Sequence, residues 1–297
     1  MPFLQHLGWN LRVFGFVGLV ALLALIVFAL APIVHLSFGQ TRAGLAEGSR
    51  GSAGTGWRRL GSRLVVVELA TAVVLLVGAG LLGRSLYSLL RVRIGFQPEH
   101  LVTLQVAVPR GNYPDDAKLI ALERDLISRM ESLPGVTSAG LTSSLPVGSN
   151  GNTAWFRIIG RPWHGEHNEV PQRDVSTRYF ATLGSKLIRG RYFTEAEDAS
   201  KPPVAIVNQA FVRQYFPGED AIGKQITPLT DPPHPIQIVG IVEDIKEGPL
   251  EVDTVPALYF PFNQSTDRFF GLVVRTSQAD APLLPAMVAG IRQLDPG

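Results

Sequence analysis

The strongest constraint on the fold is an apolar run at residues 64–82, LVVVELATAVVLLVGAGLL, whose only ionisable side chain is Glu68. As a helix rising about 1.5 Å per residue, this run spans close to the ~30 Å hydrocarbon core of a bilayer. It lacks the alternation of a barrel strand, so a helix is the fold that satisfies its backbone in lipid. We expect residues 64–94 to form a transmembrane helix that continues into a stalk, residues 84–93. Glu68 would then snorkel to the interface or form an ion pair, with a proton relay as the alternative.

A second apolar run lies upstream. Residues 13–31, VFGFVGLVALLALIVFALA, carry no charge, and we expect a transmembrane helix within residues 1–38. Residues 29–31, Ala-Leu-Ala, resemble a signal-peptidase site, which makes a cleaved signal peptide the alternative. The run exceeds the ~7–15 apolar residues typical of a signal peptide, and Pro32 follows the possible cut, so a retained helix is favoured.

The segment between the two runs, residues 39–63, contains seven glycines and five arginines. This composition predicts a flexible or lightly structured loop. The other flank of the second run carries three arginines, at positions 84, 91 and 93. By the positive-inside rule, residues 39–63 form a cytoplasmic connector, and the C-terminal region lies on the opposite side of the membrane.

From residue 95 onward the pattern becomes that of a folded, water-soluble α+β domain. Residues 101–108 and 136–141 are expected to be strands flanking an amphipathic helix at 115–133, which gives a βαβ-like unit. After a Gly/Ser/Asn loop at 146–152, shorter strands are expected at 154–159, 203–207, 224–227, 236–242, 257–260 and 269–275. Asn208 is expected to cap a short helix at 209–216, and a last helix spans 282–294. A closing strand would be expected after that helix, so we expect the chain to be a fragment of a longer protein.

Several motifs resemble chemical sites without their full requirements. Gly78, Gly80 and Gly83 form G-x-G-x-x-G, but inside the apolar helix, where close helix packing is the simpler explanation. Residues 218–225, GEDAIGKQ, nearly match a P-loop but lack the final Ser/Thr, so a turn into a strand is expected. His164 and His167 have no obvious third ligand for zinc.

Carboxylates cluster at three places, and we expect solvated surfaces there rather than acid–base pairs. The clusters are Glu195/Glu197/Asp198, Glu219/Asp220 and Glu243/Asp244. The chain has no cysteine, which excludes thiolate chemistry. We therefore predict no catalytic, cofactor-binding or metal-binding residues, no cofactor and no enzymatic activity.

Composition supports a membrane-anchored domain. The chain is 46% hydrophobic with a mean hydropathy of +0.18, and its length and composition fit two spans plus one or two soluble domains. Its net charge is only +2 and no basic run is interleaved with aromatic residues, so nucleic acid is not an expected partner.

Four stretches together resemble the MacB-like periplasmic core domain of MacB-type, FtsX-like ABC transporter permeases. They are residues 95–114, 133–148, 189–226 and 238–264. Residues 45–51 and the following apolar helix also resemble the duplicated-permease subgroup first described in acidobacteria. In that subgroup the last helix of one permease repeat leads into the first helix of the next.

The resemblance implies a periplasmic core domain at residues 95–297 with two lobes. A porter-like α+β lobe would comprise residues 98–145 and 266–297, and a β-rich lobe, residues 146–265, would be inserted between them. It also implies a bacterial inner-membrane permease component that couples ATP hydrolysis by a separate ABC ATPase subunit to movement of this domain. Its partners would be that ATPase, further permease helices or a second permease copy, and the bilayer. A membrane-tethered sensor or ligand-binding module without an ATPase is the alternative.

Overall fold

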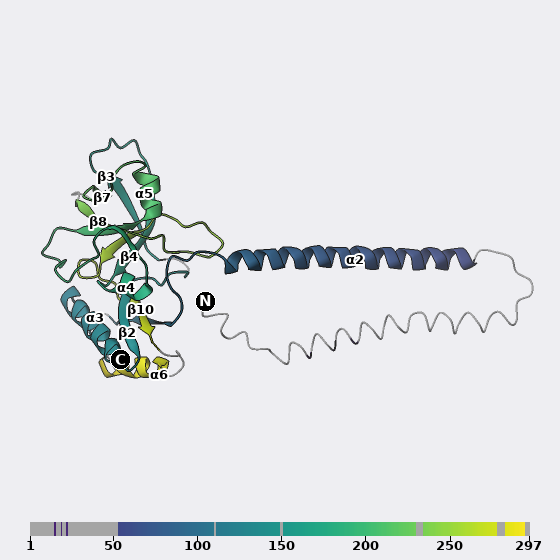
Figure 1. Ribbon diagram of the computed structural model, residues 1–297, viewed down its shortest axis with the longest axis horizontal. Helices are drawn as coiled ribbons and strands as arrows, with labels where there is room; N and C mark the ends of the chain where they lie inside the picture. The colour runs from purple at the N-terminus through teal and green to yellow at the C-terminus, as the bar shows by residue number, and fades with distance from the viewer. Residues whose placement is uncertain are drawn as a thin grey trace, which may run out of the picture. The chain divides into compact units, whose positions relative to one another are not determined.

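The computed structural model describes residues 53–109, 111–148, 151–229, 234–277 and 283–294, together with Gly15, Leu19 and Leu22 (Figure 1). The chain divides into two compact units, Met1–Leu86 and Tyr87–Gly297. Its elements are α2 (Ala53–Leu90), β1 (Leu101–Ala107), α3 (Asp116–Glu131), β2 (Val136–Thr142), β3 (Thr153–Ile158), β4 (Asn168–Val175), α4 (Tyr179–Leu183), β5 (Leu187–Gly190), β6 (Val204–Asn208), α5 (Gln209–Tyr215), β7 (Gln225–Pro228), β8 (Ile236–Val242), β9 (Leu258–Pro261), β10 (Phe269–Thr276) and α6 (Leu283–Leu294).

The long apolar helix expected around residues 64–82 is present as part of α2. Its segment Val66–Leu90 has a mean hydropathy of 2.2. In the most apolar stretch of that segment, no residue is buried against other parts of the protein. By length and composition, it is the one helix in the described part of the chain that could cross a membrane. The three glycines of the G-x-G-x-x-G pattern lie inside this helix, with open space beside each α-carbon. They therefore lack the strand before the helix that a dinucleotide-binding loop requires.

The expectation of a loop throughout residues 39–63 is wrong for its second half, because α2 already begins at Ala53. Starting a helix is unfavourable, whereas extending an existing helix adds one hydrogen bond for each residue. The apolar run forms the helix first, and the glycine-rich segment before it can then join the helix at a lower cost. Each interior glycine still costs about 1 kcal/mol relative to alanine. Residues 39–52 and the run at 13–31 lie outside the described residues, apart from Gly15, Leu19 and Leu22, which are helical.

The strand–helix–strand unit at the start of the domain is confirmed as β1, α3 and β2. Both strands pair antiparallel with β10, which lies between them, so β1 and β2 run parallel without touching. Asp115 caps α3 by accepting a hydrogen bond from the Lys118 amide. Alternate residues of β10 join α3 and α6 in one apolar core, which includes Leu119, Leu126, Met130, Phe270, Leu272, Val274 and Met287.

Six further strands form a closed ring in the order β4–β3–β7–β8–β6–β9, with β9 pairing back onto β4. We call this ring the barrel. Its core contains Phe156, Ile226, Ile238 and Leu258, and the helix α5 adds Phe211 to it. Asn208 caps α5 as expected, accepting a 2.9 Å hydrogen bond from the Phe211 amide.

The barrel and the β1–β10–β2 strands belong to one sheet within the described residues, joined where Thr142 of β2 pairs with Val175 of β4. A third apolar cluster lies at this connection, where Tyr179 and Phe180 of α4 pack with Tyr259 of β9 and Val273 of β10. The domain is therefore α+β, as expected. Its division into lobes at 98–145 with 266–297 and at 146–265 stays a prediction.

Candidate functional site

The P-loop-like segment at residues 218–225 is a turn between α5 and β7, as expected. Gly218 and Gly223 have φ values of +76° and +82°, which explains why glycine occupies both positions. The flanking acids are exposed and paired, Glu219 with Arg161 at 2.9 Å and Asp220 with Arg189 at 2.9 Å. The segment does not follow a strand, so it lacks the framework of a phosphate-binding loop.

The two histidines considered for zinc point to different partners. The His164 ring lies 3.3 Å from the Glu166 carboxylate, and the His167 ring meets Trp155 edge-on at 5.1 Å between centroids. Within the described residues, no group of three or more His, Cys, Asp or Glu side chains is placed to hold a metal ion.

The expectation of solvated carboxylates is wrong for Glu197. This side chain is buried, accepts hydrogen bonds from the Thr194 amide at 2.5 Å and hydroxyl at 2.7 Å, and pairs with Arg191 at 2.6 Å. Asp244 is also partly buried, and it accepts a 2.6 Å hydrogen bond from the Ala210 amide in the first turn of α5. Both carboxylates satisfy main-chain donors at a turn or helix start, which is a structural role.

Residues 91–99, which follow α2, are held by three parts of the domain, and we call these contacts the stalk junction. The Lys246 amide, in the loop between β8 and β9, donates a 2.9 Å hydrogen bond to the Ile94 carbonyl. The Gln97 amide donates at 2.9 Å to Leu183 at the end of α4. Arg275 of β10 donates to the carbonyls of Gln97 at 2.9 Å and of Glu99 at 3.0 Å.

Gly95 lies at the tightest point of the stalk junction. Its φ is +76°, and a β-carbon added there would sit 1.9 Å from the Asp244 carbonyl oxygen. Both the backbone conformation and the close approach therefore require glycine. The chain passes directly against the β8–β9 loop at this residue.

The β8–β9 loop is anchored in turn by a buried ion pair. The Arg173 Nε of β4 lies 2.8 Å from the Glu247 carboxylate, and both side chains are almost fully buried. Tyr259 of β9 donates a 2.6 Å hydrogen bond to the same carboxylate. Burial raises the pKa of Glu247, and the Arg173 charge opposes that rise. Lys246 is thus fixed between the linker after α2 and a charged network inside the domain.

A second buried acid, Glu123, lies on the buried side of α3. Glu123 is buried, and its Oε1 has no hydrogen-bond partner among the described residues. Burial, with smaller contributions from Asp174 and Asp267, raises its pKa from 4.5 to about 10. Burial also raises the pKa of Asp174 to about 6. Glu123 is therefore neutral near neutral pH, which removes the cost of burying a charge.

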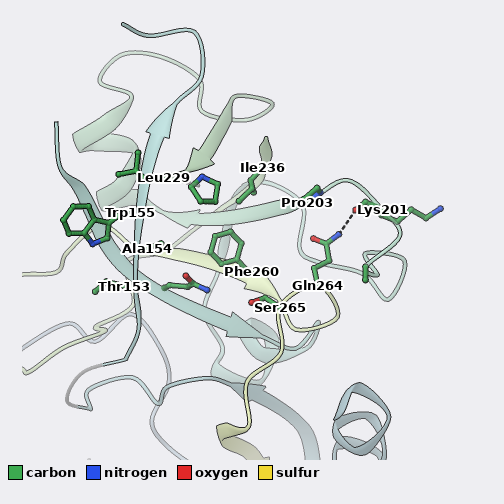
Figure 2. A pocket seen from close by; sticks show the side chains of 13 residues that line it. Thr153, Ala154, Trp155, Lys201, Pro203, Leu229, Ile236, Phe260, Gln264 and Ser265 are labelled. Carbon is green, nitrogen blue, oxygen red and sulfur yellow. Dashed lines mark hydrogen bonds between the residues drawn. The ribbon is translucent and has the colours of Figure 1, made fainter. Parts of the chain in front are cut away.

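A cavity of about 530 Å³ opens at one end of the barrel, and we call it the barrel mouth (Figure 2). Five of the barrel strands line it directly, and Pro203 lines it just before the sixth, β6. Phe260 lies centrally among the lining side chains, with Trp155 and Leu229 to one side and Gln264 to the other (Figure 2). The lining is largely apolar.

Sequence reasoning did not find the stalk junction, the Arg173–Glu247 pair, Glu123 or the barrel mouth. The available signal for Glu123 was its place between Leu122 and Leu126 on the apolar side of a helix that the sequence did predict. The ion pair had no such signal, since its residues lie 74 positions apart.

Comparison with known proteins identifies the family of the chain. Two solved structures are similar to parts of it. One is the periplasmic region of MacB from Actinobacillus actinomycetemcomitans, at 14% identity and a TM-score of 0.47, and the other is the extracellular domain of the noncanonic ABC-type transporter YknZ from Gram-positive bacteria, at 16% identity and a TM-score of 0.43. The first match covers 69% of this chain and 88% of the MacB chain, and the second covers 65% and 94%. No curated protein sequence matches the chain significantly. The family model for the MacB-like periplasmic core domain matches residues 64–291, and the chain therefore belongs to the family of MacB-like periplasmic core domains.

Proposed function

We propose that this chain is a permease component that transmits motion from the membrane to its outer domain, driven by ATP hydrolysis in a separate ABC ATPase subunit. Membership in the family of MacB-like periplasmic core domains supports a place in an ABC-type transporter permease. In this proposal the segment Val66–Leu90 of α2 crosses the bacterial inner membrane. Residues 39–63, which include the first turns of α2, face the cytoplasm, and residues 95–297 lie in the periplasm. Further permease helices or a second permease copy would complete the assembly.

The observation that carries the proposal is the stalk junction. Residues 91–99 follow directly on α2 and are bonded to the β8–β9 loop, to α4 and to β10. The Arg173–Glu247 pair fixes the β8–β9 loop to β4. The hydrogen bond between this loop and Ile94 is therefore anchored to a barrel strand. Displacement of the linker would therefore pull on packed strands, which deform little.

Membrane topology is the first test. Since the chain has no cysteine, single cysteines can be introduced without a background, at Glu251 in the outer domain and at Arg50 in the connector. A membrane-impermeant maleimide added to right-side-out vesicles should label Glu251→Cys and leave Arg50→Cys unlabelled until detergent is added. The reverse pattern would disprove the topology.

The ATPase partner is the second test. Affinity purification of the full chain from its native membrane should recover an ABC ATPase subunit in a defined ratio. The sensor alternative is favoured by the barrel mouth, which offers a site for a ligand. A kinase or cyclase recovered in place of an ATPase would support the sensor and contradict ATP-driven transmission.

A further inference from the structure

The outer face of β3 carries exposed aromatic and apolar side chains. Burial alternates along the strand, since Phe156 belongs to the barrel core whereas the neighbouring Trp155 is 43% exposed. Successive side chains of a strand point to opposite faces, so Trp155 and Arg157 project outward from the barrel. Figure 2 shows the Trp155 ring pointing away from Phe260. Ile159, directly after the strand and 41% exposed, continues this outward row.

The loop between β3 and β4 adds two rings to this face. The Arg157 guanidinium lies 4.7 Å from the centre of the Trp163 ring, which is itself 50% exposed. The His167 ring meets Trp155 edge-on, with 5.1 Å between the ring centroids. Both rings therefore contact side chains that point outward. We call Trp155, Arg157, Ile159, Trp163 and His167 the β3 ridge.

The β3 ridge concentrates the apolar surface that the domain exposes. Among the described residues from 95 onward, eight large apolar side chains are exposed, and three of these belong to the β3 ridge. A fourth, Leu229, lies beside it, because its amide donates a 3.2 Å hydrogen bond to the Trp155 carbonyl. Tryptophan and arginine are enriched among the residues that contribute most binding energy at protein interfaces. The β3 ridge thus has the composition of the centre of a protein interface.

Arg157 is a cation without an acidic partner in the described part of the chain. No ion pair found there includes it, and its buried Nε has no hydrogen-bond partner there. The nearest acids of the hairpin have other partners. Glu166 pairs with a histidine of its own loop, and Glu169 accepts from Thr153, which lies on the far side of Trp155 from Arg157. An arginine that stacks on an indole and lacks an acid is suited to pair with a carboxylate from another molecule.

Two other occupants fit the β3 ridge less well. In a two-fold dimer the same patch of each copy meets its counterpart, so two Arg157 side chains would approach each other without an acid between them. Small ligands bind in hollows that cover most of their surface. Of the five residues of the β3 ridge, only Trp155 borders the barrel mouth, so the remainder of the ridge lies outside that cavity.

We propose that the β3 ridge binds a partner protein through a carboxylate that pairs with Arg157 and apolar side chains that pack on Trp155 and Trp163. This inference goes beyond transmission of motion, since it depends only on the outer face of the barrel. It holds whether the chain works as a permease component or as a sensor. The topology and ATPase tests have separate readouts, so either proposal can fail alone.

Photo-crosslinking of the full chain in its native membrane tests the proposal. The photoreactive residue p-benzoylphenylalanine replaces Ile159 in one variant and Ile188 in the control. Both isoleucines are 41% exposed, and Ile188 lies on β5, which does not pair with β3. Illumination should join position 159 to one partner protein, and mass spectrometry should place the adduct in a segment of that protein that contains Asp or Glu. Position 188 should give no adduct with that protein.

Charge variants then test the role of Arg157. Arg157→Glu should lower the yield of the adduct about tenfold, as expected for a residue at the centre of an interface. Arg189→Glu, which changes the charge equally at an exposed arginine of β5, should leave the yield unchanged. Lysine in place of the mapped acid of the partner should restore the adduct with Arg157→Glu, and this restoration would exclude misfolding as the cause of the loss.

Four results would overturn the proposal. The first is an adduct at position 159 with lipid or with a second copy of this chain, and the second is no adduct above that of the Ile188 control. The third is an adduct whose yield Arg157→Glu leaves unchanged. The fourth is a loss that lysine in the partner does not restore.

Discussion

Replacement of Glu123 by glutamine should stabilise the protein in a pH-dependent way. The folded chain keeps this carboxyl protonated because burial raises its pKa from 4.5 to about 10. The unfolded chain ionises it above its ordinary value near 4.5. A raised folded pKa gives stability that is complete below 4.5 and is lost as the pH rises toward 10. Glutamine has a similar shape and no proton to lose, so Glu123→Gln removes this dependence.

The magnitude follows from the shift. Each pH unit above the unfolded pKa costs about 1.4 kcal/mol, so Glu123 costs the wild type on the order of 3 kcal/mol near pH 7. About 1 kcal/mol changes the melting temperature of a domain of this size by ~2–4 °C. Glu123→Gln should therefore melt about 6–12 °C higher than the wild type near pH 7, and the two should converge as the pH approaches 4.5.

The assay is thermal unfolding of the full chain in detergent, followed by tryptophan fluorescence across a pH series. Asp125→Asn is the matched control, since Asp125 lies on the same helix, loses the same charge on substitution and is exposed. That variant should track the wild type at every pH. A gap between Glu123→Gln and the wild type that stays constant with pH, or no gap at all above neutrality, would refute the reasoning.

The other predictions concern the stalk junction and its anchor. Gly95→Ala should destabilise the domain by several kcal/mol in chemical denaturation, because it combines an unfavourable φ with a backbone clash, whereas Gly111→Ala, at an open position, should not. Arg275→Lys should increase hydrogen exchange of residues 91–99, because lysine cannot bridge the carbonyls that arginine holds. Arg173→Met should cost about 3–5 kcal/mol by leaving a buried charge unpaired, and adding Glu247→Leu should restore most of that loss. Failure of the double variant to recover would show that the network is needed for more than charge balance.

Local pattern was enough to predict the strands and helices with strong periodicity. The amphipathic helix α3 and the apolar strand β8 follow from spacing and composition alone. The missed elements either have a local pattern that opposes their structure or are too short to show a pattern. β4 has a proline at position 171 and charged residues at 169, 173 and 174, and α4 and β5 are too short to show a period.

The contacts that define the candidate sites are long-range, which explains why the sequence did not predict them. Buried Arg173 and Glu247 contradict the usual exposure of charged residues, and only their pairing makes their burial tolerable. The closure of the barrel depends on the parallel pairing of β4 with β9, two strands separated by most of the barrel sequence. Neither strand carries a local signal that identifies the other as its partner.

Strand β10 connects the domain's two groups of strands to the segment that follows α2. β10 pairs with β1 and β2, and its Arg275 also holds the linker that follows α2. The β8–β9 loop holds the same linker and belongs to the barrel. One short segment is thus bonded to both groups of strands, so a displacement of that segment would act on both together. The acceptors of these hydrogen bonds are main-chain carbonyls, so the stalk junction depends on backbone position more than on side-chain identity. Gly95 and Arg275 are therefore the two residues at which a substitution should separate movement of residues 91–99 from movement of the domain.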